Sequence, residues 1–368
     1  MLHLRKLPLG FLSLFVLAAL VAGCNNFFTD ENGTGGDGGT VQPRFVYTAN
    51  SGSDNVSAFV VNTSTGALTP ATGSPFTAGT SPNSVGSNAD GTLLYVANEG
   101  GGVSAFTINR NNGSLTQAAG SPFTPGTLFV AIAVDPAARF VYAAESGAGN
   151  IFGYSVAAGT GVLSAVPNSP FAVSGAPIRL SVDPTGRFVY VALGVDGTDV
   201  FRINADGSLA FVENEPTTTG RESHEVVVEP MGHFAYVADG ISGVAAYAVN
   251  ASTGELTLIA NSPFAAGTEP VGVAVDPDGL FLYAANRGSN NVSVFRINTN
   301  GTLTGGAAVA SGSTPVSAAV DPSGHFLYVA NEGANNISIY SINSTSGALS
   351  SVDTEAAGTN PESIVATP

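Results

Sequence analysis

The stretch FLYVAN at 326–331 lies between VDPSG (320–324) and EGANNISIY (332–340), and versions of it recur along the chain. Six further copies begin at Phe45, Leu93, Phe140, Phe188, Phe234 and Phe281. The seven units follow one another at intervals of 45–48 residues and leave nothing of 45–368 outside the repeat. A fixed period of this length is typical of propellers and other repeat architectures.

Each unit is expected to contain four strands. In F-x-Y-x-A the two aromatics stand two residues apart and therefore share one face of a strand. A turn rich in Asn and Gly leads to an alternating strand such as 291–298, and a T-G or N-G turn leads to a short third strand. The fourth strand is apolar and ends in V-D-P-x-G, a turn sequence. With no helical period, the units predict an all-β, seven-bladed β-propeller.

The end of the chain supports a closed ring. The last residues read NPESIVATP, and Pro368 aligns with Pro277 of a V-D-P turn. This segment therefore supplies the inner strand that the first unit lacks. Closing the ring with strands from both ends of the propeller removes an exposed sheet edge.

The first residues read as a targeting segment. Arg5 and Lys6 precede an apolar run, 9–20, that is too short for a stop-transfer span. Residues 1–23 are expected to be a lipoprotein signal peptide, because Val21–Gly23 and Cys24 resemble a bacterial lipobox. Residues 24–43 are then a Gly-rich tether, and 44–368 the propeller. The lipid bilayer would be a partner through lipidated Cys24, which predicts a cell-envelope protein at the periplasm, outer membrane or cell surface.

The net negative charge of the chain excludes nucleic-acid binding from the expected functions. After the leader, nine Arg stand against 27 Asp and Glu, with no Lys. Such an acidic chain repels nucleic acid, so none is expected as a partner. The single Cys leaves no internal disulfide. The Gly-rich turns do not form a phosphate loop, and the recurring Asp of V-D-P is explained by turn chemistry, so neither a cofactor nor a metal is predicted.

Two columns of residues should surround one mouth of the central channel, where the inner strands begin. The first is Asn83, Val130, Ile178, His224, Val271, Val316 and Glu362. The second, one residue on, is Ser84, Ala131, Arg179, Glu225, Gly272, Ser317 and Ser363. Nearby turns add Asp196, Asp239, Arg287, Glu99 and Glu332. A ligand site is therefore predicted at this mouth.

The units FLYVANEGANNISIY (326–340) and FLYAANRGSNNVSVF (281–295) resemble those of seven-bladed lactonases related to bacterial 6-phosphogluconolactonase, and of YVTN-repeat propellers. The resemblance covers all seven units. It implies an inner strand P-H-x-H, on which His224 takes the second His while Glu222 replaces the first. It also implies P-R on the next two inner strands, where this chain has Val271 and Val316.

The resemblance implies a catalytic role for His224, which can act as general base for water, with Arg179 or Arg287 as the electrophilic partner. The predicted catalytic residues are His224, Arg179 and Glu222. The predicted ligand-binding residues at the mouth are Arg221, Glu225, Asp239, Arg287, Glu362 and Asn83. Two alternatives remain: Arg179 and Glu225 simply pair with each other across neighbouring blades, and His224 is a hydrogen-bonded rim residue.

Two function classes follow. The sequence favours an anchored propeller that binds a ligand or a protein partner, or acts as a scaffold, because the expected Arg pair is missing. The alternative is a carboxylic-ester hydrolase that opens sugar lactones. A small neutral sugar or lactone suits the acidic mouth better than a phosphorylated one.

Overall fold

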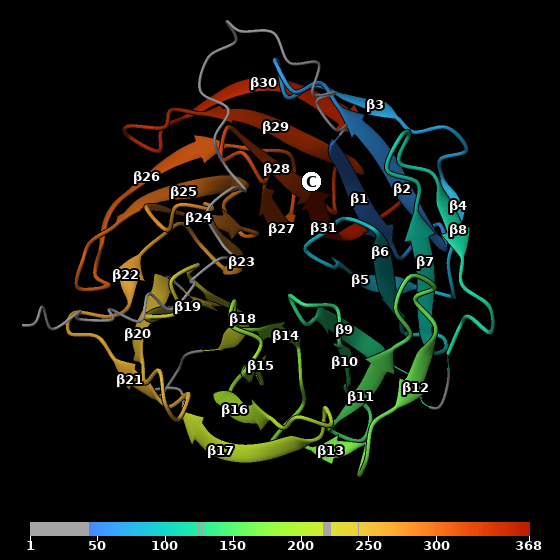
Figure 1. The fold of residues 1–368 in the computed structure, drawn as a ribbon. Helices are drawn as coiled ribbons and strands as arrows, with labels where there is room; N and C mark the ends of the chain where they lie inside the picture. The colour runs from blue at the N-terminus through green and yellow to red at the C-terminus, as the bar shows by residue number, and fades with distance from the viewer. Residues whose placement is uncertain (1–43, 124–125, 127, 216–221, 242) are drawn as a thin grey trace, which may run out of the picture. The chain divides into compact units, whose positions relative to one another are not determined.

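Seven antiparallel sheets stand around a central axis (Figure 1). The computed structural model describes residues 44–123, 126, 128–215, 222–241 and 243–368, and every regular element in them is a β-strand. The all-β, seven-bladed propeller is therefore confirmed. Within the described residues, no helix has the length and apolar character needed to cross a membrane. The predicted leader, Cys24, the tether and Arg221 lie outside these residues.

The strands nearest the axis are the apolar strands of the repeat. They are β31 (Pro361–Thr367), β5 (Pro82–Ser87), β9 (Phe129–Val134), β14 (Arg179–Val182), β18 (Ser223–Val228), β23 (Pro270–Val275) and β27 (Pro315–Val320), in blades 1 to 7. Each pairs with the aromatic strand of its blade: β1 (Arg44–Asn50), β6 (Leu93–Asn98), β10 (Phe140–Glu145), β15 (Phe188–Ala192), β19 (Phe234–Asp239), β24 (Phe281–Asn286) and β28 (Phe326–Asn331).

The alternating strands come next, third from the axis. They are β2 (Asn55–Val61), β7 (Val103–Ile108), β11 (Asn150–Val156), β16 (Thr198–Ile203), β20 (Gly243–Val249), β25 (Asn291–Ile297) and β29 (Asn336–Ile342). The outer strands are short in blades 1, 2, 3 and 5: β3 (Leu68–Pro70), β8 (Leu115–Gln117), β12 (Leu163–Ala165) and β21 (Leu256–Leu258). In blades 1, 3 and 5 a two-residue strand continues the edge: β4 (Phe76–Thr77), β13 (Phe171–Ala172) and β22 (Phe264–Ala265).

Blades 4, 6 and 7 depart from the expected short outer strand. Their outer strands, β17 (Leu209–Glu215), β26 (Leu303–Ala310) and β30 (Leu349–Ala356), have seven or eight residues. The four blades with a short outer strand each carry Ser-Pro-Phe soon after it, beginning at Ser74, Ser121, Ser169 and Ser262. Proline cannot donate a ladder hydrogen bond, so the outer strand is interrupted there, and it continues where this sequence is missing.

The repeated Phe and Tyr join each blade to the next one, with the two rings on one face as expected. In six blades the buried Tyr hydroxyl donates a hydrogen bond to the carbonyl of a turn glycine in the following blade. These pairs are Tyr47–Gly113, Tyr142–Gly207, Tyr190–Gly254, Tyr236–Gly301, Tyr283–Gly347 and Tyr328–Gly66, at 2.9–3.1 Å. At Gly66, φ is +78° and a Cβ would lie 2.3 Å from the Phe326 ring, so both backbone conformation and packing favour glycine.

Blade 1 is completed by the end of the chain, as predicted. β31 pairs with β1 in antiparallel register, with Val46 opposite Ala366 and Tyr47 opposite Val365. Ile364 is 5% exposed and packs in the same apolar cluster as Phe326 of blade 7. Closure therefore combines a shared sheet with the same type of interface that joins the other blades.

Candidate functional site

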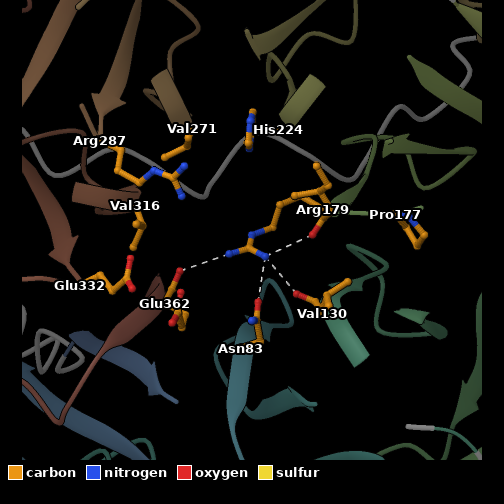
Figure 2. A pocket seen from close by; sticks show the side chains of 11 residues that line it. Asn83, Val130, Pro177, Arg179, His224, Val271, Arg287, Val316, Glu332 and Glu362 are labelled. Carbon is orange, nitrogen blue, oxygen red and sulfur yellow. Dashed lines mark hydrogen bonds between the residues drawn. The ribbon is translucent and has the colours of Figure 1, made fainter. Parts of the chain in front are cut away.

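A pocket of about 270 Å³ occupies the mouth of the central channel (Figure 2). It is lined by the whole first column, together with Pro177, Arg179, Arg287 and Glu332. In six inner strands, all but that of blade 4, the column residue is the extra residue of a β-bulge. A bulged residue is left out of the ladder and its side chain is redirected. The bulges therefore explain why one residue of each of these six strands faces the pocket.

Arg179 reaches from blade 4 across the pocket (Figure 2). Its Nη1 donates hydrogen bonds to Asn83 Oδ1 at 2.9 Å, to the Val130 carbonyl at 3.1 Å and to the Ile178 carbonyl at 3.2 Å. Its Nη2 donates to the Glu362 carbonyl at 3.4 Å. All four acceptors are neutral oxygens. Among the described residues Nε has no acceptor, so the Nε–Nη2 edge of the fork keeps donor capacity for a ligand oxygen.

Asn83 holds this guanidinium in place. While its Oδ1 accepts from Arg179, its Nδ2 donates to Glu99 Oε1 at 2.9 Å. The Glu99 carboxylate also accepts a hydrogen bond from Ser81 Oγ at 3.3 Å. A carboxylate that accepts from the amide nitrogen fixes which way the amide points, and the amide oxygen is thereby turned to the guanidinium.

His224 and Glu222 form a carboxylate–imidazole pair in blade 5. The distance from His224 Nε2 to Glu222 Oε2 is 3.2 Å, and the two side chains are 17% and 48% exposed. The imidazole lies over Gly240, where a Cβ would be 2.3 Å from Nε2. A neutral imidazole that donates Nε2–H to the carboxylate has Nδ1 as its acceptor.

The second cation, Arg287, is already paired. Its Nε donates to Glu269 Oε1 at 3.0 Å, and Nη2 contacts the same oxygen. This hydrogen bond raises the pKa of Arg287, with a smaller contribution from the Glu332 charge. The pair leaves little net positive charge on this side of the pocket.

The rim of the pocket over blades 7 and 1, next to Arg287, is acidic. Burial raises the pKa of Glu362, the nearby Glu332 and Glu99 charges raise it further, and a hydrogen bond from Ser51 Oγ at 2.9 Å opposes these effects. Glu332 lines the pocket in the neighbouring blade 7. An additional anion at this rim would meet repulsion.

Glu225 lies outside the pocket lining and joins two blades. Its Oε2 accepts a hydrogen bond from Val273 N at 2.8 Å. Serines of the same column make the equivalent bond to the next inner strand: Ser84 to Ile132 N, Ser317 to Ile364 N and Ser363 to Val85 N, at 3.2–3.3 Å. Burial raises the pKa of Glu225 to about 7, against the effects of that hydrogen bond and of the Arg179 charge. Within the described chain no ion pair joins Arg179 to Glu225, so the pairing considered from sequence is not formed.

Asp239 also lies away from the pocket at the mouth. It is 3% exposed and lines a separate, much smaller cavity with Glu222 and Thr198. Burial on β19 follows from its place in the F-x-Y-x-A strand, since the Asn residues at this position in blades 1, 2, 6 and 7 are also buried. The sequence-based assignment of Asp239 to the channel mouth therefore does not match its position.

The V-D-P carboxylates are turn acceptors. Asp276 accepts hydrogen bonds from Leu280 N and Phe281 N, and Asp321 accepts from His325 N and Phe326 N. In the described part of the chain, no group of three or more His, Cys, Asp or Glu side chains is arranged to hold a metal ion.

Two contributors to the site were missed from sequence. Glu269 neutralises Arg287, and Gly240 makes room for His224. The signal for Gly240 was present, because most other blades carry a larger, polar residue at that turn position.

Comparisons with known proteins agree with this architecture. The sequence matches the family model described as "Lactonase, 7-bladed beta-propeller" over residues 47–366. No curated protein matches it. The structure is similar to that of a putative 6-phosphogluconolactonase from Bacteroides fragilis, with TM-score 0.76 and 23% identity over 90% of this chain and 100% of that chain.

Two further solved structures are similar to the same degree. One is a protein from Lactobacillus plantarum, with TM-score 0.73 and 23% identity over 89% of this chain and 100% of that one. The other is a periplasmic gluconolactonase of Pseudomonas aeruginosa, with TM-score 0.72 and 20% identity over 89% and 99%. At these identities the likeness shows the fold.

Proposed function

Because this chain belongs to the seven-bladed β-propeller lactonase family, we propose that it hydrolyses lactones in the pocket at the mouth of the channel. The observation that carries the proposal is that one pocket is lined by an imidazole paired with a carboxylate and by a guanidinium whose Nε–Nη2 edge keeps donor capacity. These are the parts that an ester hydrolysis needs: a base for water, and donors for the oxygen on which negative charge develops.

The chemistry follows from the two side chains. Neutral His224, held by Glu222, takes a proton from water on Nδ1 while the water oxygen attacks the lactone carbonyl carbon. The carbonyl oxygen gains negative charge, which the Nε–Nη2 edge of Arg179 stabilises. The ring C–O bond then breaks, and the leaving alkoxide takes the proton back from the imidazolium. The product is a hydroxy acid.

The charges of the pocket favour an uncharged lactone. Glu269 neutralises Arg287, while Glu332 and Glu362 add negative charge to the rim. The two positions where the family resemblance implies Arg are Val271 and Val316, both of which line the pocket. A phosphorylated substrate would therefore lack the cationic partners that a phosphate needs.

The test is the hydrolysis of δ-gluconolactone and a panel of neutral lactones by the wild type and by His224→Ala. Loss of the base should lower the rate by about 10²- to 10⁴-fold. His233→Ala is the matched control, because His233 lies exposed in a turn after Glu229. An unchanged rate in His224→Ala would remove the imidazole from the mechanism.

A second candidate is a binding propeller without turnover, which one observation favours. Arg179 is held by four oxygens of the protein itself, as in a preorganised binding site. A binding protein would show lactone or hydroxy-acid affinity by calorimetry, with no hydrolysis by the wild type and an unchanged affinity in His224→Ala.

We also propose that Cys24 carries a lipid anchor that keeps the propeller in the cell envelope. The support is the sequence alone: a basic and apolar leader that ends in the only Cys of the chain. Labelling with a radioactive fatty acid should mark the wild type in the membrane fraction, whereas Cys24→Ser should be unlabelled. Equal labelling of both would contradict the anchor.

A further inference from the structure

The turn that joins the aromatic strand to the alternating strand has two forms. Its first position holds Ser51, Glu99, Ser146, Gly194, Gly240, Arg287 and Glu332 in blades 1 to 7. Its second position holds Gly52, Gly100, Gly147, Val195, Ile241, Gly288 and Gly333. Five blades thus place a polar residue before a glycine. Blades 4 and 5 reverse the order and place a glycine before a branched apolar residue.

In the five polar blades the second position cannot hold a side chain without rearrangement. A Cβ at Gly100 would lie 2.4 Å from Thr80 Cβ, and one at Gly333 would lie 2.6 Å from Thr314 Oγ1. In four of these blades the polar residue before the glycine faces the mouth instead. Ser51 binds Glu362, Glu99 binds Asn83, and Arg287 and Glu332 line the pocket.

In blades 4 and 5 the first-column side chain takes the place of the polar turn residue. A Cβ at Gly194 would lie 3.2 Å from Ile178 Cδ1, and one at Gly240 would lie 2.3 Å from His224 Nε2. Ile178 and His224 both line the pocket. The glycines of these two turns therefore lie under side chains that line the pocket, and Val195 and Ile241 follow them directly in the chain.

Those second residues are exposed. Val195 is 66% exposed and Ile241 is 48% exposed. The two blades are joined at this point, because Gly194 and Ser223 exchange backbone hydrogen bonds of 3.0 and 2.9 Å. The Ile241 carbonyl in turn accepts from Glu269 N at 3.4 Å, beside the Arg287 pair. We refer to Val195 and Ile241 together as the apolar rim.

The apolar character continues inward from the rim. Ile178 and Pro177 line the pocket on the blade 4 side, whereas the rim over blades 7, 1 and 2 carries the carboxylates of Glu332, Glu362 and Glu99. Blades 4 and 5 thus carry apolar side chains on the same side of the mouth as His224 and Arg179, together with the carboxylates of Asp196 and Glu222, and blades 7, 1 and 2 form the acidic side. A ligand that matches both sides has one polar and one apolar part.

We propose that the substrates of this site are uncharged lactones that carry an alkyl substituent, which lies against the apolar rim while the lactone ring lies at His224 and Arg179. This rests on the proposed lactone hydrolysis and specifies its substrate class. A fully hydroxylated sugar lactone would leave Val195 and Ile241 in water, whereas an alkyl chain removes apolar surface on both partners from water.

The test compares δ-valerolactone, δ-hexalactone, δ-octalactone and δ-decalactone. In the wild type, kcat/KM should rise by about twofold for each added methylene until the chain passes the rim, as partial burial of a CH₂ group implies. In Val195→Thr/Ile241→Thr this increase should be lost, while the rate on δ-valerolactone stays within about twofold. Val195→Leu/Ile241→Leu should keep the increase.

The control variant is Met231→Thr/Leu280→Thr. Met231 and Leu280 are exposed apolar residues in the turns that follow β18 and β23, at the opposite strand ends from the mouth. Turnover with no chain-length dependence, or a dependence that survives in the double Thr rim variant, overturns the apolar rim as a specificity element. Absence of turnover on every lactone overturns the proposed function instead. In that case the affinities of the four lactones are measured by calorimetry for the wild type and the double Thr rim variant. An affinity that rises with chain length only in the wild type supports the apolar rim, and any other pattern overturns it.

Discussion

At the scale of single residues, the missing side chain of Gly240 positions the His224 imidazole. The ring occupies the space that a polar side chain takes in most other blades, and a Cβ at 240 would lie 2.3 Å from Nε2. Glycine is required here for close approach and not for a left-handed backbone, since φ at 240 lies outside that region.

Gly240→Ala should therefore impair hydrolysis much more than folding. The added methyl group displaces the imidazole from Glu222, and a displacement of about 1 Å lowers the rate by about 10²-fold. Rates on a neutral lactone and thermal melts check this expectation. Gly86→Ala is the control, because a Cβ there meets only ordinary contacts of 3.4 Å or more. Equal losses of activity in both variants would contradict a specific role of Gly240.

Arg179 shows what the sequence could and could not predict about the site. Alignment of the repeats predicts Arg179 beside the mouth, where it lines the pocket, and its column neighbour Glu225 suggests an ion pair. The long side chain instead crosses the pocket to the oxygens of Asn83, Val130 and Glu362. Column position follows from the repeat, whereas side-chain direction depends on which acceptors the opposite blades present.

At the scale of elements, the inner strands are linked by the second column. Serine hydroxyls of three blades and the carboxylate of Glu225 accept an N–H of the next inner strand. A hydroxyl makes this bond at any ordinary pH. A carboxylate with a raised pKa makes the interface between blades 5 and 6 depend on protonation.

Glu225→Gln should change the pH dependence of stability. The folded pKa of about 7 lies above the ordinary 4.5, so the Glu225 contribution is fully present below about pH 4.5 and is lost as pH rises through 7. The free energy of unfolding of the variant, relative to that of the wild type, should rise by on the order of 1–3 kcal/mol between about pH 5 and about pH 8.

Denaturant unfolding at the two pH values measures this gain. Glu255→Gln, a change in an exposed turn, is the control and should show no such trend. Parallel curves for wild type and Glu225→Gln would mean that the carboxylate is already ionised in the folded protein.

The blade interfaces offer a matched pair of tyrosines. Tyr328 donates to the Gly66 carbonyl at 3.1 Å, whereas the buried hydroxyl of Tyr95 has no hydrogen-bond partner within the residues that the structure describes. Tyr328→Phe should cost about 1 kcal/mol of unfolding free energy, and Tyr95→Phe should be neutral or stabilising. Chemical denaturation checks both. Similar losses for the two variants would mean that the hydroxyl bond contributes nothing beyond ring packing.

The elements themselves were largely predictable, for physical reasons that also explain the exceptions. F-x-Y-x-A, the Asn-Gly turns and V-D-P-x-G each specify local geometry, so the strand order followed from the repeat. The lengths of β17, β26 and β30 did not follow, because an outer strand is exposed along one edge and has weak apolar patterning. Its length depends on whether Ser-Pro-Phe interrupts the ladder.

At the scale of the whole propeller, β31 ties the two ends of the repeat region together. It pairs with β1 in blade 1 and packs beside β27 and β5 of the blades on either side. Removal of 361–368 should expose the inner edge of β1 and cost several kcal/mol, since it also uncovers Val46 and its apolar cluster.

A circular permutant tests whether the sharing of blade 1 between the two ends of the chain stabilises the ring, because it keeps the same strands. A chain that begins at 361, continues through a short linker into Arg44 and ends at Ala356 keeps every strand but makes each blade continuous. It should fold to the same ring with lower stability than the native order, because no blade is then shared between the ends. A permutant as stable as the native order would show that shared closure is not what holds the ring together.

The bulges at the start of the inner strands place the pocket-lining residues apart from the residues that hold neighbouring blades together. The Tyr hydroxyls and Gly carbonyls that join neighbouring blades come from the aromatic strands and from turns, whereas the bulged residues that face the pocket come from the inner strands. A lineage could therefore exchange any of these six bulged residues by single mutations at little cost to stability. Propeller families with such bulges should accordingly diverge first in ligand specificity and last in fold.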